Sequence, residues 1–336
     1  MAKEIGSEFW EVPLQDNENS FFPESCLWFL SGRVALMYIL KDIKKRYGIK
    51  KASLPSWCCD SMIKPFLETG FSVDFYSVYM SAGKLCKNIP DDSELLLVLD
   101  YFGFCDSYDY SDYNGIVIRD LTHSVFCKNY TDADYYFGSL RKWCGIWSGG
   151  FAFGKGLLFE NTEIVQPDLK YVNLRKESME KKALYISGKS KSKDFLSGFN
   201  EAEEILDSIN TVGSASERDV RLSRYLDIGY IKEKRRENAK ILLDSLQDIA
   251  VFPKMNEDDC PLFIPVAVKS RDKIKGQLIE NGIYCPVHWP ITKLHKLNDY
   301  TRDIYDKEIS LICDQRYTKE DMYRIVEVMG KGTKLC

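Results

Sequence analysis

Hydrophobic residues between positions 30 and 155 follow two spacings in turn, one typical of helices and one typical of strands. Leu36, Leu40 and Ile43 recur on one face of a predicted helix that ends at Gly48. A second helix is predicted at residues 61–69, and strands are predicted at residues 72–77, 95–100, 115–120, 134–138 and 149–153. Short apolar strands separated by helices predict an α/β fold with a mostly parallel sheet, whose strand carboxyl ends share one edge.

The second half of the chain begins with a polar region. Residues 161–220 show little apolar periodicity before Phe195, so we expect mobile loops and helices there. Beyond them we predict a long helix from Ile231, a strand at 262–268, a helix at 270–281, an extended segment at 284–289 and a helix from Thr318 to Gly330 that starts with a Thr318–Asp321 capping box. The pattern predicts a large domain over residues 1–228 and a smaller C-terminal α+β domain over residues 229–336.

The composition excludes several classes of protein. The 336 residues are 45% hydrophobic and carry a net charge of −4, so no strong positive field attracts nucleic acid or an acidic membrane surface. No apolar run reaches the ~20 residues that a membrane helix needs. The first residues lack an apolar stretch followed by a cleavage site, and we therefore expect a cytoplasmic protein.

The eleven cysteines are scattered along the chain, and no two of them form a CxxC pair. Only three histidines are present as possible co-ligands, so we expect no metal site. Most of the thiols are expected to be buried as small hydrophobic groups.

Two charged residues stand where a parallel sheet would bring them to its ligand-binding edge. Asp120 ends the predicted strand at 115–120, and Lys142 lies just past the next predicted strand. A pyridoxal-phosphate enzyme needs both groups, because a lysine amine condenses with the cofactor aldehyde and a carboxylate keeps the pyridine nitrogen protonated. Either residue alone is more simply interpreted as a solvated charge, so the inference depends on their combination.

Five short motifs follow one another along the chain. They are Phe29-Leu30-Ser31-Gly32-Arg33-Val34-Ala35-Leu36, Asp100-Tyr101-Phe102-Gly103, Asp120-Leu121-Thr122-His123, Ser139-Leu140-Arg141-Lys142 followed by Gly149-Gly150, and Tyr284-Cys285-Pro286-Val287-His288. In type and order they resemble motifs of the DegT–StrS group of sugar-nucleotide aminotransferases, as do residues 309–321. This resemblance covers nearly the whole chain and implies the three-layer type I fold of pyridoxal-phosphate enzymes.

The resemblance also implies a role for each motif. Lys142 would carry pyridoxal 5'-phosphate, Asp120 would hold its pyridine nitrogen, and His123 would approach its phenolic oxygen. Gly32, at a helix start, and Ser139 would meet the cofactor phosphate. A structural explanation stays open for three of these residues. Gly32 could belong to a helix cap, Ser139 could cap a turn, and His123 could be a structural histidine.

Two further roles are implied for rings. Phe102 would lay its ring on the cofactor, with Tyr101 as the competitor, because adjacent strand residues face opposite sides. His288 is a candidate for the substrate side of the site, or a structural residue beside Pro286 and Pro290.

The chain departs from the family pattern at several positions. Arg33 replaces the usual threonine and could add a charge to the cofactor phosphate or to an anionic substrate. The lysine motif is compressed, which leaves the role of Ser139 open. Asp219 stands where the family has an asparagine from the partner subunit, and since a carboxylate repels phosphate we do not assign it that role. Arg221 remains a candidate substrate residue. Ile312 replaces a proline.

By resemblance, the expected reaction moves an amino group from an amino acid, glutamate by expectation, to a keto group of a nucleotide-linked sugar, in the service of polysaccharide synthesis. A homodimer is expected because the family builds its sites across two subunits. A sugar dehydratase of the same fold would have histidine in place of Lys142. A pyridoxal-phosphate enzyme with a non-sugar acceptor, and a binding or regulatory protein without turnover, remain alternatives.

Overall fold

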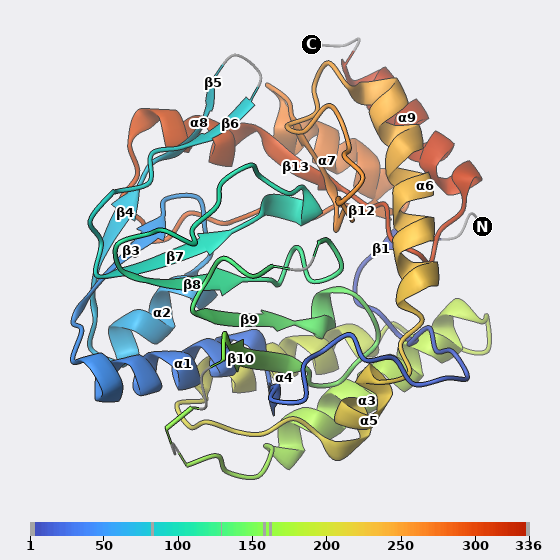
Figure 1. The fold of residues 1–336 in the computed structure, drawn as a ribbon. Coiled ribbons are helices and arrows are strands. Elements are labelled where there is room, and N and C mark those ends of the chain that lie inside the picture. Colours follow the sequence, from blue (N-terminus) through green and yellow to red (C-terminus); the bar gives the residue numbers. More distant parts are fainter. Residues whose placement is uncertain (1–3, 82–83, 129, 157–158, 161–162, 334–336) are drawn as a thin grey trace. The chain divides into compact units, whose positions relative to one another are not determined.

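The computed structural model describes residues 4–81, 84–128, 130–156, 159–160 and 163–333 (Figure 1). Residues 1–3 and Cys336 lie outside the described residues. The chain forms two compact units: unit 1 comprises Met1–Ser7, Ile49–Asp134 and Ile228–Cys336, and unit 2 comprises Glu8–Gly48 and Tyr135–Asp227. The division into domains 1–228 and 229–336 stays a prediction.

Unit 1 contains four parallel strands in the order β8-β7-β3-β4. These are β3 (Lys51–Pro55), β4 (Ser72–Tyr76), β7 (Leu95–Leu99) and β8 (Ile116–Asp120). Every residue of β7 is a buried leucine or valine, as is typical of a parallel strand that is covered on both faces. The strands predicted at 72–77, 95–100 and 115–120 are therefore confirmed, and Asp120 ends β8 at the carboxyl edge.

The other elements of unit 1 are helices and short strand pairs. The helices are α2 (Asp60–Glu68), α6 (Ile228–Leu246), α7 (Arg271–Glu280), α8 (Asp299–Lys307) and α9 (Lys319–Thr333), of which α6 and α9 lie side by side in Figure 1. The strand pairs are β1 (Ile5–Gly6) with β12 (Ile283–Tyr284), β5 (Val78–Ser81) with β6 (Lys84–Lys87), and β11 (Ile264–Ala267) with β13 (Glu308–Leu311).

The end of α9 corrects one prediction. We expected this helix to stop at Gly330, but it continues to Thr333 because Gly330 keeps the helical conformation. A glycine ends a helix when it turns left-handed, and Gly48 does so after α1, with a φ of 67°. At the other end of α9, the backbone N–H of Thr318 donates to the Asp321 carboxylate at 3.1 Å, which confirms the capping box.

Unit 2 contains three antiparallel neighbours, β2 (Leu27–Phe29), β10 (Gly150–Gly154) and β9 (Tyr135–Ser139), with β10 in the middle. Helix α1 (Gly32–Tyr47) packs on β9 and β10, and the Ser31 hydroxyl caps its start by accepting from the N–H of Val34 at 3.3 Å. This helix and both strands β9 and β10 were predicted.

Helices fill the region that lacks apolar periodicity. They are α3 (Leu169–Ile186), α4 (Phe195–Ser208) and α5 (Glu217–Ser223), and α3 packs against α4. Across the described part of the chain, no helix combines the length and the apolar character needed to cross a membrane.

Candidate functional site

A tight turn follows β7 in unit 1 and buries two aromatic rings. The 3-10 turn η1 (Tyr101–Gly103) contains Phe102 at a left-handed φ of 56° and Gly103 at 81°. A Cβ on Gly103 would lie 1.9 Å from the carbonyl oxygen of Cys260, so no other residue fits there. Because the two rings belong to a turn, the strand alternation that we used to choose between Tyr101 and Phe102 does not apply.

Phe102, His123 and His288 are buried and form one cluster with Trp289, which is half-buried. The Phe102 ring centroid lies 5.0 Å from that of His123 and 5.2 Å from that of His288. Trp289 stacks on Phe102 and His123 at 6.2 and 5.6 Å. The structure therefore brings together three residues that the sequence singled out separately.

The backbone of this cluster constrains the His123 ring. The N–H of Phe102 points to Nδ1 of His123 at 3.3 Å, so Nδ1 acts as the acceptor and a neutral imidazole carries its proton on Nε2. An Nε2–H group is the donor that a phenolic oxygen would require. The geometry is compatible with the role expected for His123, which stays a prediction.

Asp120 ends β8 with its side chain buried. One of its carboxylate oxygens, Oδ1, accepts from the N–H of Thr122 at 2.7 Å. A carboxylate held by a backbone N–H at a strand end stays charged more easily than one that is buried without donors. That is the property needed to hold a protonated ring nitrogen.

Trp57 is a member of the same aromatic region that our reading of the sequence missed. Its fully buried ring stacks on Tyr101 with centroids 4.6 Å apart, and its Nε1–H donates to the carbonyl of His288 at 2.8 Å. Trp57 follows β3, so it stands just past the end of a parallel strand, as Asp120 does. The rule that singled out Asp120 would have found it.

Lys142 lies in unit 2, in the 3-10 turn η2 (Leu140–Lys142) that follows β9, and its side chain is exposed. The start of α1 packs beside this strand end. A Cβ on Gly32 would lie 3.3 Å from both the Gly138 carbonyl oxygen and the Ser139 Cβ. The N-terminus of α1, with its N–H groups, therefore packs closely on the end of β9, three positions before Lys142 in the sequence.

Asp219 stabilises the loop between Lys142 and the glycine pair at 149–150. Its buried carboxylate accepts from the N–H and the hydroxyl of Ser148 at 2.8 and 2.7 Å, and from the hydroxyl of Ser216 at 2.8 Å. Arg218 pairs with Asp219 at 2.8 Å. The side chain is used inside its own unit, which is consistent with not assigning it a phosphate role.

The two arginine candidates differ in their surroundings. Arg33 pairs with Asp207 at 2.7 Å and donates to the carbonyl of Leu206 at 3.3 Å, so its charge is directed to α4. Arg221 is exposed on α5. A cofactor role for Arg33 and a substrate role for Arg221 stay predictions.

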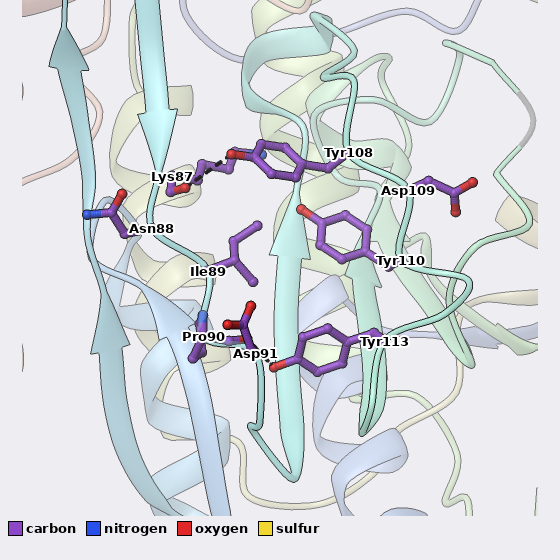
Figure 2. A pocket seen from close by; sticks show the side chains of 9 residues that line it. All are labelled: Lys87, Asn88, Ile89, Pro90, Asp91, Tyr108, Asp109, Tyr110 and Tyr113. Carbon is purple, nitrogen blue, oxygen red and sulfur yellow. Dashed lines mark hydrogen bonds between the residues drawn. The ribbon is translucent and has the colours of Figure 1, made fainter.

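A hollow of about 500 Å³ in unit 1 involves none of these residues (Figure 2). It is lined by Lys87, Asn88, Ile89, Pro90, Asp91, Tyr108, Asp109, Tyr110 and Tyr113. The hydroxyls of Tyr108 and Tyr113 donate to the carbonyls of Lys87 and Pro90 at 3.2 and 2.6 Å, which holds the two lining loops together. The hydroxyl of Tyr110 is closed off from solvent.

Comparison with known proteins gives a clear result for the fold. No sequence-family model and no curated protein sequence matches the chain. Among solved structures, PseC from Helicobacter pylori, an aminotransferase of pseudoaminic acid biosynthesis, aligns with a TM-score of 0.65 over 97% of this chain and 99% of its own, at 16% identity. A DegT DnrJ EryC1 StrS aminotransferase from Brucella abortus aligns with a TM-score of 0.59, at 15% identity, over 91% of this chain and 85% of its own.

The chain has the fold of the DegT–StrS sugar aminotransferases. This fold confirms the α/β class that the hydrophobic pattern predicted, and it is the fold of the group that the five motifs resemble. A protein named as NifS-like shares the fold more distantly, with a TM-score of 0.57, 11% identity and coverage of 94% of this chain and 84% of its own. At these identities the likeness concerns the fold, and the chemistry must be argued from the residues of this chain.

Proposed function

We propose that this protein is a pyridoxal-phosphate-dependent aminotransferase that moves an amino group from glutamate to a keto group of a nucleotide-linked sugar. The observation that carries the proposal is the position of Lys142, exposed in the turn that follows β9, a strand whose end packs against the N-terminus of α1. The fold adds support, because structures of Spr1654 from Streptococcus pneumoniae, named as a sugar aminotransferase, include a PLP form that aligns with a TM-score of 0.61 at 14% identity over 90% of this chain and 85% of its own.

Each unit contains residues that suit one part of the cofactor. In unit 2, the N–H groups at the start of α1 and the Ser139 hydroxyl suit a phosphate, and the absence of a side chain at Gly32 keeps the helix start close to the strand. In unit 1, the buried Asp120 carboxylate suits a protonated ring nitrogen, and the Phe102 ring suits a planar aromatic partner.

When bound, pyridoxal phosphate supplies an electron sink for the carbanion that forms as the donor loses its α-proton. Lys142 would take that proton on Nζ and pass it to the carbon that gains the amino group, as the carbon that loses the amino group gives up its proton. Asp120 would keep the positive charge on the ring nitrogen, and the Nε2–H of His123 would donate to the phenolic oxygen. The arrangement requires an uncharged Lys142 amine each time it accepts a proton.

A second acceptor class has one observation in its favour. The NifS-like neighbour shares the fold without a name that refers to sugar, so a pyridoxal-phosphate reaction on a non-sugar acceptor is the competing function. Turnover with glutamate and a panel of nucleotide-linked keto sugars, set against free keto acids, separates the two. A protein that binds the cofactor and turns over neither set is a binding protein.

Borohydride reduction of the protein loaded with pyridoxal phosphate, followed by peptide mapping, tests the central residue. We expect a yellow protein whose reduced cofactor is attached to Lys142, and a colourless, unlabelled Lys142→Ala variant. Lys181→Ala, an exposed lysine of α3, is the matched control and should stay labelled. Wild-type protein that remains colourless and unlabelled would contradict the proposal.

We also propose a homodimer, since the resemblance implies sites that two subunits complete. Sedimentation at working concentration tests it, with and without pyridoxal phosphate. A monomer under both conditions would contradict the dimer while leaving the assignment of Lys142 intact.

A further inference from the structure

A buried chain of three polar groups leads from β13 to His288. Glu308 and Ser310 stand two positions apart on β13, so their side chains share one face of the strand. The Ser310 hydroxyl contacts both Oε1 of Glu308 and Nδ1 of His288, the latter at 2.8 Å. All three residues are buried, with exposures of 0% for Glu308 and Ser310 and 6% for His288.

The backbone holds this chain in register. The N–H of Ser310 donates to the carbonyl of Pro286 at 3.0 Å, and the N–H of His288 donates to Oε2 of Glu308 at 2.7 Å. Oε2 therefore accepts from a backbone N–H group whose direction is fixed by the main chain. Only Oε1 can therefore form a hydrogen bond with the Ser310 hydroxyl. Because that hydroxyl has one hydrogen, it donates either to Oε1 or to Nδ1 of His288, and not to both at once.

We propose that Glu308 controls, through the hydroxyl of Ser310, which ring nitrogen of His288 carries the proton. With Glu308 ionised, Ser310 donates to Oε1 and its oxygen accepts from Nδ1–H, so Nε2 is the unprotonated nitrogen. With Glu308 protonated, Oε1–H donates to Ser310, which donates in turn to Nδ1, and Nε2 carries the proton. One proton is taken up from solvent between the first state and the second.

The surroundings place this change within an accessible range of pH. Burial raises the pKa of Glu308 to about 8, opposed by the hydrogen bonds from Ser310 and His288 and by the charge of Arg271. Arg271 itself donates to the main-chain carbonyl of Glu308 at 3.3 Å. Glu308 also interacts with the thiol of Cys285, whose pKa burial raises to about 12, and the ring of His123 lies 5.9 Å from that of His288.

The consequence concerns the substrate side of the proposed site, and this part rests on the proposed function. His288 lies 5.2 Å from Phe102, ring to ring, in the cluster that also holds His123. An Nε2 that accepts can take a proton or bind a hydroxyl as its donor, whereas an Nε2–H can only donate. Glu308 and Ser310 would then be positioning residues that act through His288.

Glutamine at position 308 imitates the protonated state. The N–H of His288 still requires an acceptor, so the amide carbonyl of Glu308→Gln would occupy the position of Oε2 and its NH₂ would donate to Ser310. The variant should therefore hold His288 as the Nε2–H tautomer at every pH. Ser310→Ala removes the connection and should separate the tautomer of His288 from the titration of Glu308.

Nitrogen NMR of histidine-labelled protein tests the inference directly, because the chain has only three histidines. The variants His123→Gln and His295→Gln each lose the signals of one histidine, so the signals that persist in both variants belong to His288. In the wild type we expect His288 to change from Nε2–H to Nδ1–H at about pH 8, and in Glu308→Gln we expect no change between about pH 6.5 and about pH 9.5. Glu320→Gln, an exposed glutamate of α9, is the control and should behave as the wild type.

A wild-type His288 that keeps one tautomer throughout, or a Glu308→Gln protein that changes as the wild type does, would overturn the inference. Near-ultraviolet circular dichroism shows whether each variant keeps its tertiary structure, and Ser310→Ala supplies a second test. In the enzyme, kcat/KM for the acceptor should change by about tenfold through this pH range in the wild type and not in Glu308→Gln. Absence of any turnover would count against the proposed function alone, since the NMR result does not depend on it.

Discussion

Oδ2 of Asp219 accepts from both the N–H and the hydroxyl of Ser148, at 2.8 and 2.7 Å. The hydroxyl of Ser216, which caps α5, donates to the same oxygen at 2.8 Å. One carboxylate thus joins the start of α5 to the loop that follows Lys142. Because every one of these partners is a donor, an acid suits the position better than the asparagine expected from the family.

Asp219→Asn tests this account. The amide has one acceptor and one donor group, so its NH₂ would face donors where the carboxylate now accepts from them. We expect the free energy of unfolding to fall by about 1–3 kcal/mol, the usual effect of a mismatched buried hydrogen bond. Urea denaturation measures it, and Glu217→Gln, an exposed neighbour on α5, should change it little. Equal stability of the two variants would contradict the account.

Asp120→Asn separates charge from structure in the proposed site. Asparagine can still accept from the N–H of Thr122 through Oδ1, so the fold should persist, but it cannot neutralise a positive ring nitrogen. We expect kcat to fall by about 10²–10³-fold, a typical effect of losing one electrostatic contact to the reacting group.

Asp134→Asn is a matched control for that variant. Asp134 also accepts from a backbone N–H, that of Val117, at 2.9 Å, and it lies near the opposite end of β8. Steady-state kinetics with glutamate should show a large loss for Asp120→Asn only. Similar losses in both variants would indicate a structural role for Asp120.

Gly150 allows β10 to approach the start of α1. A Cβ at this position would lie 2.0 Å from the carbonyl oxygen of Ser31, and backbone atoms cannot move aside as the end of a side chain can. We expect Gly150→Ala to destabilise the protein by about 1–3 kcal/mol and to weaken pyridoxal-phosphate binding, because the helix start would be displaced. Gly276→Ala on α7, with nothing within 4 Å, should be neutral or stabilising. Thermal unfolding and cofactor titration compare the two.

The sequence predicted best those elements in which several local signals favour the same structure. Helix α1 has an apolar face, a serine cap and a left-handed glycine at its end, and β7 is uniformly apolar. In each case local preference and burial agree, so the pattern is easy to recognise. Asp120 was found for the same reason, because a strand end and a carboxylate coincide.

Helix α3 could not be predicted from apolar spacing because its buried face is partly charged. Tyr171, Arg175, Ser178 and Lys182 recur at helical spacing on the buried side. Arg175 pairs with Glu8 at 3.0 Å, a residue far away in the sequence. A helix whose inner face depends on distant partners is not visible in a hydrophobic pattern.

The candidate site shows the same limit. The proximity of Phe102, His123 and His288 comes from a left-handed turn and from contacts across more than a hundred residues. Neither is encoded in the motifs themselves, and the stacking of Trp57 on Tyr101 likewise depends on packing between segments that are distant in the sequence. Motifs identified candidate chemistry, while turns and long-range packing decide which residues meet.

Glu308 also has a consequence for stability that can be measured without any substrate. In the folded protein burial raises its pKa from 4.5 to about 8, so between these values the folded state holds a proton that the unfolded chain releases. The free energy of unfolding should therefore fall as pH rises through this window and stop falling above about pH 8.

Glu308→Gln has no proton to lose, so its stability relative to the wild type should increase from about pH 5 to about pH 8. The full difference is on the order of 5 kcal/mol, the value of the pKa shift from 4.5 to about 8 converted to free energy. Urea denaturation at several pH values measures it, and other titrating groups cancel because both proteins contain them. Glu320→Gln should show no such trend, since that side chain is exposed. A stability difference that is independent of pH would mean that Glu308 is solvated in the folded protein and ionises normally.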